Sequence, residues 1–169
     1  MILPVLMLVV CGASSDKDKP AEEISHLDVI EWVKFDVGLK QAAEDNKYIM
    51  AYFWRPGCGW CKRMEQDTYS NEEIADLVGA YFTPVKINGS SNEKYKTSTG
   101  EITARQLTRQ FRLTGYPSVC FLKSDGAILT CLPGYVPPDK FETVLMYIGE
   151  EHYKNKSFQD YLKSIEKKY

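Results

Sequence analysis

Apolar residues recur in short blocks from about residue 30 onward, and these blocks predict alternating strands and helices. The most distinct block is Tyr48–Trp54 (YIMAYFW), an unbroken run of apolar or aromatic residues. Such a run is typical of a central strand that is covered on both faces. Further strands are predicted at 30–35, 83–87, 118–122 and 127–132, the last two forming a hairpin around Ser124-Asp125-Gly126.

Helices are predicted between these strands from capping residues and from apolar positions three or four residues apart. Asp36 is the expected N-cap of a helix that ends at Asp45, and Ser70–Glu73 has the pattern of a capping box. The segment Asn88–Gly100 is polar and is predicted to be a loop. The remaining helices are expected at 58–69, after a Thr103/Gln106 cap, from Pro137 through Ile148, and at 157–167. This order predicts an α/β fold, in which one central mixed sheet has helices on both faces and an extra C-terminal helix follows.

The N-terminal residues form a separate unit in the pattern. Met1–Val10 is almost entirely apolar and precedes Cys11, and Leu8–Cys11 resembles the lipobox of bacterial lipoproteins. We therefore expect a signal or lipoprotein-like segment at 1–11, a flexible linker at 12–28 and one domain at 29–169. The protein would then be periplasmic or secreted, with a lipid anchor at Cys11 as one form of attachment. A frayed N-terminal strand is the alternative interpretation of residues 1–10.

The amino-acid composition and net charge indicate which class of protein the chain belongs to. The chain has 169 residues, a formal net charge of -2, 44% hydrophobic and 26% charged residues, which are values typical of one soluble globular domain. A protein that binds duplex nucleic acid would usually be clearly basic, so no nucleic-acid partner is expected. No apolar stretch reaches the roughly 18 residues that a membrane-spanning helix needs.

The sequence Cys58-Gly59-Trp60-Cys61 carries the candidate chemistry, because it lies where the central strand gives way to a helix. Cysteines three residues apart in the first helical turn share one face and can form a disulfide. The helix N-terminus is expected to lower the pKa of the Cys58 thiol, which makes Cys58 the attacking thiolate. Cys61, one turn deeper, is then the resolving thiol that releases a mixed disulfide.

Other roles for such a pair remain open at this point. Half of a zinc site would need more ligands, but the chain has no second C-x-x-C and only His26 and His152. Covalent haem attachment requires His directly after the second cysteine, where Lys62 stands. An inert buried pair is the remaining alternative. No metal or organic cofactor is expected.

Taken together, YFWRPGCGWCKRMEQDTYS, GYPSVCFLKSDG and LPGYVPPDKFETVLMYI resemble the thioredoxin superfamily. The chain is similar to the SoxW-type group of thioredoxin-related periplasmic proteins, near the C-terminal domain of DsbD, from about Glu31 to Leu162. The resemblance implies a thioredoxin fold, disulfide exchange through Cys58 and Cys61, and a cis peptide bond between Tyr116 and Pro117. It also implies that Tyr116 and Pro117 contact the substrate chain.

The sequence departs from the thioredoxin pattern at one position. Many thioredoxins carry a buried carboxylate six residues before the first cysteine, where this chain has Tyr52. The DsbD-like domain has an acid four residues after its second cysteine, and Glu65 matches that position. Because Cys61 and Glu65 share a helix face, Glu65 is a candidate proton acceptor for the Cys61 thiol. The alternative is a solvated acid paired with Lys62.

The motif and the predicted hairpin contain further residues with candidate roles. Trp60 is expected to contact substrate and shield the motif, whereas Arg55 and Lys62 are expected to be solvated surface charges. Cys120 and Cys131 lie on opposite arms of the predicted hairpin and face each other if the turn has two residues. A three-residue loop with a bulge would separate them, and two unlinked buried thiols is the preferred interpretation.

The predicted function is that of an exported thiol-disulfide oxidoreductase that exchanges disulfides with protein substrates, as a reductase or an isomerase. An exported reductase needs electrons from across the membrane, so a membrane thiol-electron donor of the DsbD type is the implied partner. The alternatives are a dithiol protein that binds a soft metal such as copper, and a thioredoxin-fold adaptor with redox-silent cysteines.

Overall fold

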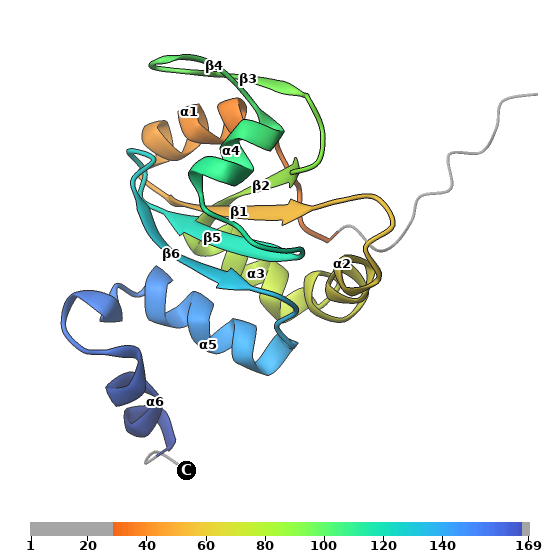
Figure 1. Cartoon of the computed structure of the whole chain (residues 1–169). Helices are drawn as coiled ribbons and strands as arrows, with labels where there is room; N and C mark the ends of the chain where they lie inside the picture. The colour runs from red at the N-terminus through yellow and green to blue at the C-terminus, as the bar shows by residue number, and fades with distance from the viewer. Residues whose placement is uncertain (1–28, 167–169) are drawn as a thin grey trace, which may run out of the picture.

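A computed structural model describes residues 29–166 and contains a four-stranded mixed sheet in the order β2-β1-β5-β6 (Figure 1). Strand β1 pairs with β2 in parallel and with β5 in antiparallel orientation, and β5 pairs with β6 in antiparallel orientation. The strands are β1 (Tyr48–Trp54), β2 (Phe82–Asn88), β5 (Ser118–Leu122) and β6 (Ile128–Pro133). Strand β1 has the predicted bounds and the predicted central place.

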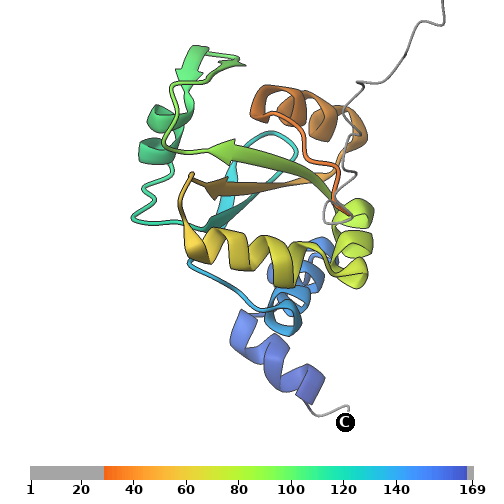
Figure 2. The same ribbon diagram turned by 90° about the vertical axis from the view of Figure 1, so that its right-hand side faces the viewer.

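Helices cover both faces of this sheet, as Figure 2 shows in a view turned from that of Figure 1. One face is packed by α1 (Phe35–Asp45) and α4 (Ala104–Gln110), and the other by α2 (Gly59–Met64), α3 (Glu72–Tyr81) and α5 (Pro138–Gly149). Side chains of β1 alternate between the two layers: Met50 and Tyr52 pack with α2, α3 and α5, while Ile49 and Phe53 pack with α1 and α4. The predicted fold class is confirmed.

The chain before β1 differs from its prediction. Residues 30–35 form no strand; only Val33 forms an isolated bridge, to Val85 of β2. Helix α1 already begins at Phe35, after Lys34 at the N-cap, and Asp36 lies within the first turn. Because Phe35, the last apolar residue of the predicted strand, belongs to the helix, too few extended residues remain to form a strand beside β2.

The predicted cap of the helix after residue 70 is also wrong. The N-cap of α3 is Asn71, whose side chain accepts a hydrogen bond from the Ile74 N–H at 3.1 Å, and not Ser70. The Ser70 hydroxyl donates instead to the Gln66 carbonyl at the end of a π-helical turn, η1 (Glu65–Tyr69), which prolongs α2. This irregular turn leaves Asn71 as the first residue free to cap the next helix.

The polar segment after β2 is not a simple loop, because it contains the hairpin β3 (Lys94–Thr97) and β4 (Gly100–Thr103). Tyr95 anchors the hairpin: its ring is 1% exposed and lies 5.8 Å from that of Phe35. The predicted Thr103/Gln106 capping box then starts α4. One buried aromatic residue in a polar stretch was too weak a signal to reveal the hairpin.

After α5 the chain passes a short 3-10 turn, η2 (His152–Lys154), and enters the predicted last helix, α6 (Phe158–Glu166). Helix α6 packs on α5 through Tyr147, whose ring lies 5.1 Å from Phe158 and 5.3 Å from Tyr161. The signal-like segment at 1–11 with Cys11, the linker at 12–28 and the end of the chain at 167–169 lie outside the described residues. Among the described helices, none has the length and apolar character that crossing a membrane requires.

Candidate active site

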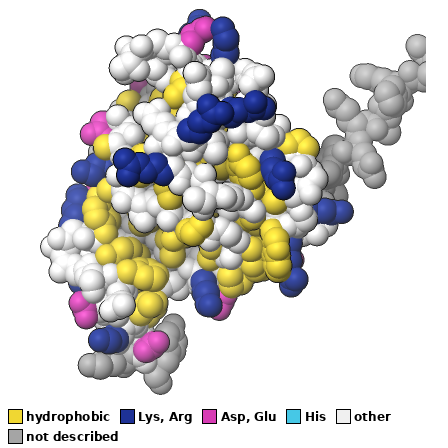
Figure 3. All heavy atoms as spheres, in the orientation of Figure 1, with side chains coloured by type: hydrophobic (Ala, Val, Ile, Leu, Met, Phe, Trp, Pro, Cys, Tyr) yellow, Lys and Arg dark blue, Asp and Glu magenta, His cyan; other side chains and the backbone are white. Residues whose placement is uncertain are grey.

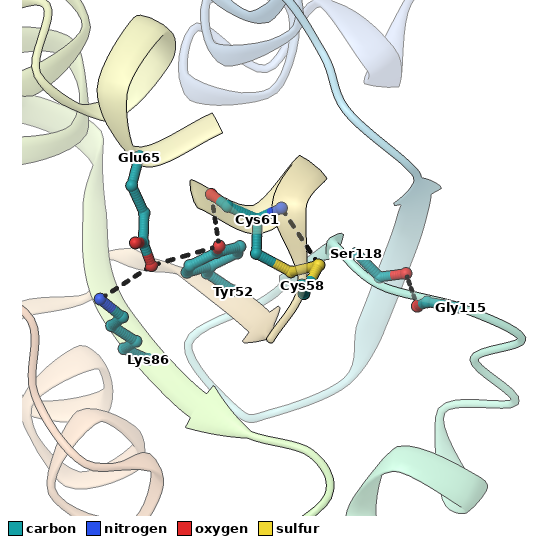
Figure 4. The surroundings of a disulfide bond; sticks show 7 residues. All are labelled: Tyr52, Cys58, Cys61, Glu65, Lys86, Gly115 and Ser118. Carbon is teal, nitrogen blue, oxygen red and sulfur yellow. Dashed lines mark hydrogen bonds and ion pairs between the residues drawn. A yellow bond between two sulfur atoms is a disulfide. The ribbon is translucent and has the colours of Figure 1, made fainter. Parts of the chain in front are cut away.

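Cys58 and Cys61 lie where β1 ends and α2 begins (Figure 4). Gly57, with a φ of 73°, makes the turn that lets the chain enter the helix. Cys58 occupies the N-cap in an extended conformation, and its Sγ accepts a hydrogen bond from the Cys61 N–H at 3.1 Å. The first sulfur therefore lies at the positive end of the helix, as the sequence predicted.

The two cysteines form a disulfide with an S–S distance of 2.11 Å and a Cα–Cα distance of 5.2 Å. Cys58 is partly exposed, whereas Cys61 is 2% exposed and packs in the core. This difference in accessibility means that an incoming thiol or disulfide meets Cys58 first. The pair therefore has the geometry that attack at Cys58 and resolution by Cys61 require.

Tyr52 lies beneath the helix and contacts both Cys61 and Glu65. Its buried hydroxyl lies 3.3 Å from the Cys61 carbonyl oxygen and 3.3 Å from Glu65 Oε1, and it can donate to either acceptor. Lys86 of β2 forms an ion pair with the same Glu65 oxygen at 3.0 Å. Burial, and then the negative charge of Glu65, hold the pKa of Tyr52 well above its ordinary value, so that Tyr52 stays a neutral donor.

This arrangement corrects the alternative interpretation of Glu65. The carboxylate is not paired with Lys62, because its partners are Tyr52 and Lys86. Figure 4 shows the Cys61 sulfur directed toward Cys58, and the Glu65 carboxylate directed toward Tyr52 and Lys86. Among the described contacts, none joins Glu65 to a sulfur atom, so Tyr52 links the carboxylate to Cys61.

Trp60 and Tyr116 line the same open groove as Cys58, which has a volume of about 610 Å³. The peptide bond between Tyr116 and Pro117 is cis, and Pro117 is buried with its carbonyl accepting from the Gly134 N–H at 2.8 Å. The structure thus brings Cys58, Trp60 and Tyr116 to one groove, and the buried Pro117 directly follows Tyr116 in the chain. Tyr116 and Pro117 are far from Cys58 along the chain, so their spacing in the sequence does not reveal that they belong to this site.

Gly89 leaves room for the Tyr116 side chain at this groove. A Cβ atom at Gly89 would lie 2.5 Å from the Tyr116 hydroxyl oxygen and 2.6 Å from Thr108 Oγ1. The Gly89 N–H also donates to the Trp54 carbonyl at 2.9 Å, which holds the end of β2 against the end of β1. Any larger residue at 89 would displace Tyr116 from its observed position.

Trp60 is 58% exposed and is supported by residues that the sequence did not single out. The Tyr135 ring lies 5.7 Å from it, and the Arg63 guanidinium lies 5.9 Å from the Trp60 ring and 5.6 Å from the Tyr135 ring. Asp67 joins them, since it accepts from Arg63 at 3.1 Å and from the Tyr135 hydroxyl at 2.9 Å. The spacing of Arg63 and Asp67 was a visible signal, but Tyr135 comes from a distant loop.

Cys120 and Cys131 form a second disulfide, with a Cα–Cα distance of 4.0 Å, so the preferred interpretation as unlinked thiols is wrong. The hairpin loop has three residues, because the Lys123 N–H donates to the Ala127 carbonyl at 2.8 Å. That loop alone would leave the cysteines one position out of register. A bulge between Phe121 and Leu122 shifts the pairing by one residue, and Cys120 then faces Cys131.

Within residues 29–166, no group of three or more His, Cys, Asp or Glu side chains is placed to hold a metal ion. Arg55 and Lys62 are exposed, as predicted, and Arg55 lines the groove beside Cys58.

Comparison with known proteins places this site in a family context. Residues 35–149 match the model of the thioredoxin-like domain family. The human spermatogenesis-associated protein 20 is 29% identical over 124 residues, a match that covers 69% of this chain but only 15% of the length of the human protein.

Two solved structures have a similar fold. A thioredoxin-fold protein from Helicobacter pylori superposes with a TM-score of 0.65 at 22% identity, covering 85% of this chain and 91% of its own. The DsbH oxidoreductase superposes with a TM-score of 0.58 at 17% identity, covering 83% of this chain and 95% of its own.

Proposed function

The chain belongs to the thioredoxin-like domain family, and we propose that it is a thiol-disulfide oxidoreductase that reduces or isomerises disulfides of protein substrates outside the cytoplasm. The observation that supports this proposal most is the Cys58–Cys61 disulfide at the start of α2, with one sulfur open to the groove and the other in the core. The finer similarity to the SoxW-type group and to the C-terminal domain of DsbD stays a prediction.

In the proposed reaction, the Cys58 thiolate attacks one sulfur of a substrate disulfide, and a mixed disulfide forms as the first substrate thiolate leaves. The Cys61 thiolate then attacks the Cys58 sulfur, which forms the Cys58–Cys61 disulfide and releases the second substrate thiol. Two electrons and two protons pass from the protein to the substrate. For isomerisation, the released substrate thiolate attacks the mixed disulfide before Cys61 does.

Other residues around the two cysteines would assist this reaction. Trp60 and Tyr116 line the groove beside Cys58, and these two residues and Pro117, which follows Tyr116, would contact the substrate chain. Glu65 would accept the proton that leaves Cys61, and the Tyr52 hydroxyl, which can donate to the Cys61 carbonyl or to Glu65, lies between the two residues. Each of these roles is part of the proposal.

The reducing direction rests on the Gly59-Trp60 pair between the cysteines, which lacks the His that helps strong oxidants hold a stable thiolate. Measuring the equilibrium potential of the Cys58/Cys61 couple against glutathione tests this choice. A continuing reductase must itself be reduced, so a membrane thiol-electron donor of the DsbD type would be its partner. Export, and a lipid anchor at Cys11, would place the protein where such a donor acts.

Reduction of insulin in the presence of dithiothreitol tests the proposed activity. The wild-type protein should accelerate insulin precipitation, and Cys58→Ser should lose nearly all of that acceleration. The matched control is Cys120→Ala/Cys131→Ala, which removes the other disulfide and should remain active. An unaccelerated reaction with the wild-type protein would contradict the proposal and favour the adaptor or soft-metal alternative.

A further inference from the structure

The groove beside Cys58 has a strongly basic rim, although the whole chain carries a net charge of -2. Arg55 lines the groove directly. Arg105 reaches its edge, because its Nη2 donates to the carbonyl of Ser90, a lining residue, at 2.8 Å. Arg112 immediately precedes the lining residue Leu113. All three arginines are exposed; Arg55 comes from the turn after β1, whereas Arg105 and Arg112 come from α4 and the residues that directly follow it.

The acidic residues near this rim do not offset its charge. Of the described residues that line the groove, none is Asp or Glu. Next to α4, Glu93 is paired with Lys34 at 2.9 Å and Glu101 with Lys94 at 3.1 Å. On α2 and the turn after it, Asp67 is paired with Arg63. The local acids are therefore neutralised by other cations.

The rim arginines, in contrast, have no such partners. Within residues 29–166, Arg55, Arg105 and Arg112 form no ion pair with an acidic side chain. Arg109 lies one turn along α4 from Arg105 and is also exposed without an acidic partner in that range. Figure 3 shows Lys and Arg side chains spread over the middle of the front face, where α4 lies in Figure 1, with acidic side chains toward the margins. The positive charge of this face is thus available to a ligand.

We propose that this rim selects substrates in which acidic residues flank the disulfide to be reduced. The inference rests on the proposed function and adds the class of polypeptide that the groove accepts. Its physical basis is charge complementarity: a cleft lined by charge of one sign raises the local concentration of an oppositely charged partner and speeds association. Arginine suits this role because its guanidinium binds carboxylates through paired hydrogen bonds.

The selection acts on encounter and on orientation before any bond changes. Carboxylates of the substrate bind at Arg55 and the other rim arginines, and the substrate disulfide is presented to the Cys58 sulfur in the same groove. The exchange itself is the one described above, in which two electrons and two protons move to the substrate. Because the attraction is electrostatic, added salt weakens it, with a screening length of about 10 Å at 0.1 M salt.

Two synthetic cyclic peptides with the same cysteine disulfide test the proposal, one with glutamates and the other with lysines beside the cysteines. The fully reduced protein is mixed with each peptide in a single turnover, quenched with acid and analysed by chromatography. At about 10 mM ionic strength the glutamate peptide should be reduced about tenfold faster. At about 0.5 M salt the two rates should come within about twofold.

Charge reversal provides the matched comparison. Arg55→Glu/Arg112→Glu should abolish or invert the ratio of the two rates, a quantity from which the intrinsic reactivity of Cys58 cancels. The control Lys123→Glu/Lys156→Glu has the same change in net charge at exposed positions away from the groove and should keep the wild-type ratio. Equal rates for the two peptides in the wild-type protein would overturn the selection and leave the proposed function intact. Reduction of neither peptide would overturn both.

Discussion

The Tyr52 hydroxyl lies 3.3 Å from the Glu65 carboxylate, directly beneath the helix that carries the two cysteines. Tyr52 comes from β1, whereas the acid that it contacts comes from the turn that prolongs the helix. Lys86 holds that acid from the other side. The proton acceptor proposed for Cys61 is therefore a carboxylate held by a tyrosine and a lysine from two neighbouring strands.

Replacing Glu65 with Gln should slow release of substrate from the mixed disulfide by about 100-fold, because a proton acceptor on the Cys61 path is lost. Alkylation of Cys58 in the reduced protein should change little, since that thiol is at the other end of the helix turn. Tyr52→Phe should have a smaller effect, and Glu72→Gln, an exposed acid of α3, serves as the control. Stopped-flow traces with equal release rates for Glu65→Gln and wild type would return Glu65 to a structural role.

Tyr69 offers a test of the buried aromatic layer below the site. Its hydroxyl is buried and has no hydrogen-bond partner among the described residues, and burial raises its pKa well above the ordinary value. Tyr69→Phe should therefore raise the free energy of unfolding at pH 7 by about 1 kcal/mol, because an unsatisfied buried hydroxyl is removed. Urea denaturation measures the change, and a loss of similar size would reveal a partner for the hydroxyl.

The same tyrosine predicts a pH dependence. The folded protein keeps the Tyr69 proton at pH values where the unfolded chain releases it. Titration of Tyr69 therefore leaves the free energy of unfolding unchanged below about pH 10 and lowers it as the pH rises further. Between pH 10 and 11, the wild-type unfolding free energy should fall more steeply than that of Tyr69→Phe, by up to about 1.4 kcal/mol per pH unit. Parallel curves for the two proteins would contradict this.

The Cys120–Cys131 disulfide should contribute to stability and not to exchange. It closes a loop over a sequence separation of 11 residues and joins the edge strand β6 to β5. Loss of this cross-link in Cys120→Ala/Cys131→Ala should lower the free energy of unfolding by about 3 kcal/mol. Urea denaturation of the oxidised proteins measures the difference; an unchanged midpoint would show that the link does not constrain the unfolded chain.

The sequence predicted well those elements whose local pattern and tertiary role agree. Tyr48–Trp54 is apolar throughout because both of its faces are covered, so pattern and structure coincide. At 30–35 the same reasoning failed, because α1 already begins at Phe35 and leaves only Val33 to form a bridge, to Val85. The hairpin at 94–103 was missed because its only fully buried residue is Tyr95.

The sequence predicted those residues of the site that lie close together along the chain. Cys58, Trp60 and Cys61 could be identified from one short motif, whereas Lys86 enters because the β1–β2 register pairs it with Tyr52. That register is a property of two strands and cannot be read from either one. The second disulfide shows the same limit, since a three-residue loop and a bulge together produced a pairing that neither produces alone.

Trp60 should matter for substrate binding and not for the reactivity of the thiol. It is 58% exposed, lines the groove and makes no hydrogen bond to either cysteine within the described contacts. Trp60→Ala should raise the KM for a protein disulfide several-fold while leaving the rate of Cys58 alkylation close to that of the wild type. Tyr135→Phe, which keeps the ring against Trp60, should leave KM nearly unchanged. An unaltered KM in Trp60→Ala would remove this residue from the binding surface.

Trapping of the mixed disulfide tests the central claim most directly. The variant Cys61→Ser retains the exposed attacking thiol and lacks the resolving one. When it is mixed with insulin that has its disulfides intact, it should accumulate a mixed disulfide with insulin and turn over more slowly than the wild type. Peptide mapping by mass spectrometry should locate the bond at Cys58, and Cys58→Ser should form no comparable complex. A complex that forms through Cys61 in Cys58→Ser but not through Cys58 in Cys61→Ser, or one attached at Cys120 or Cys131, would contradict the account.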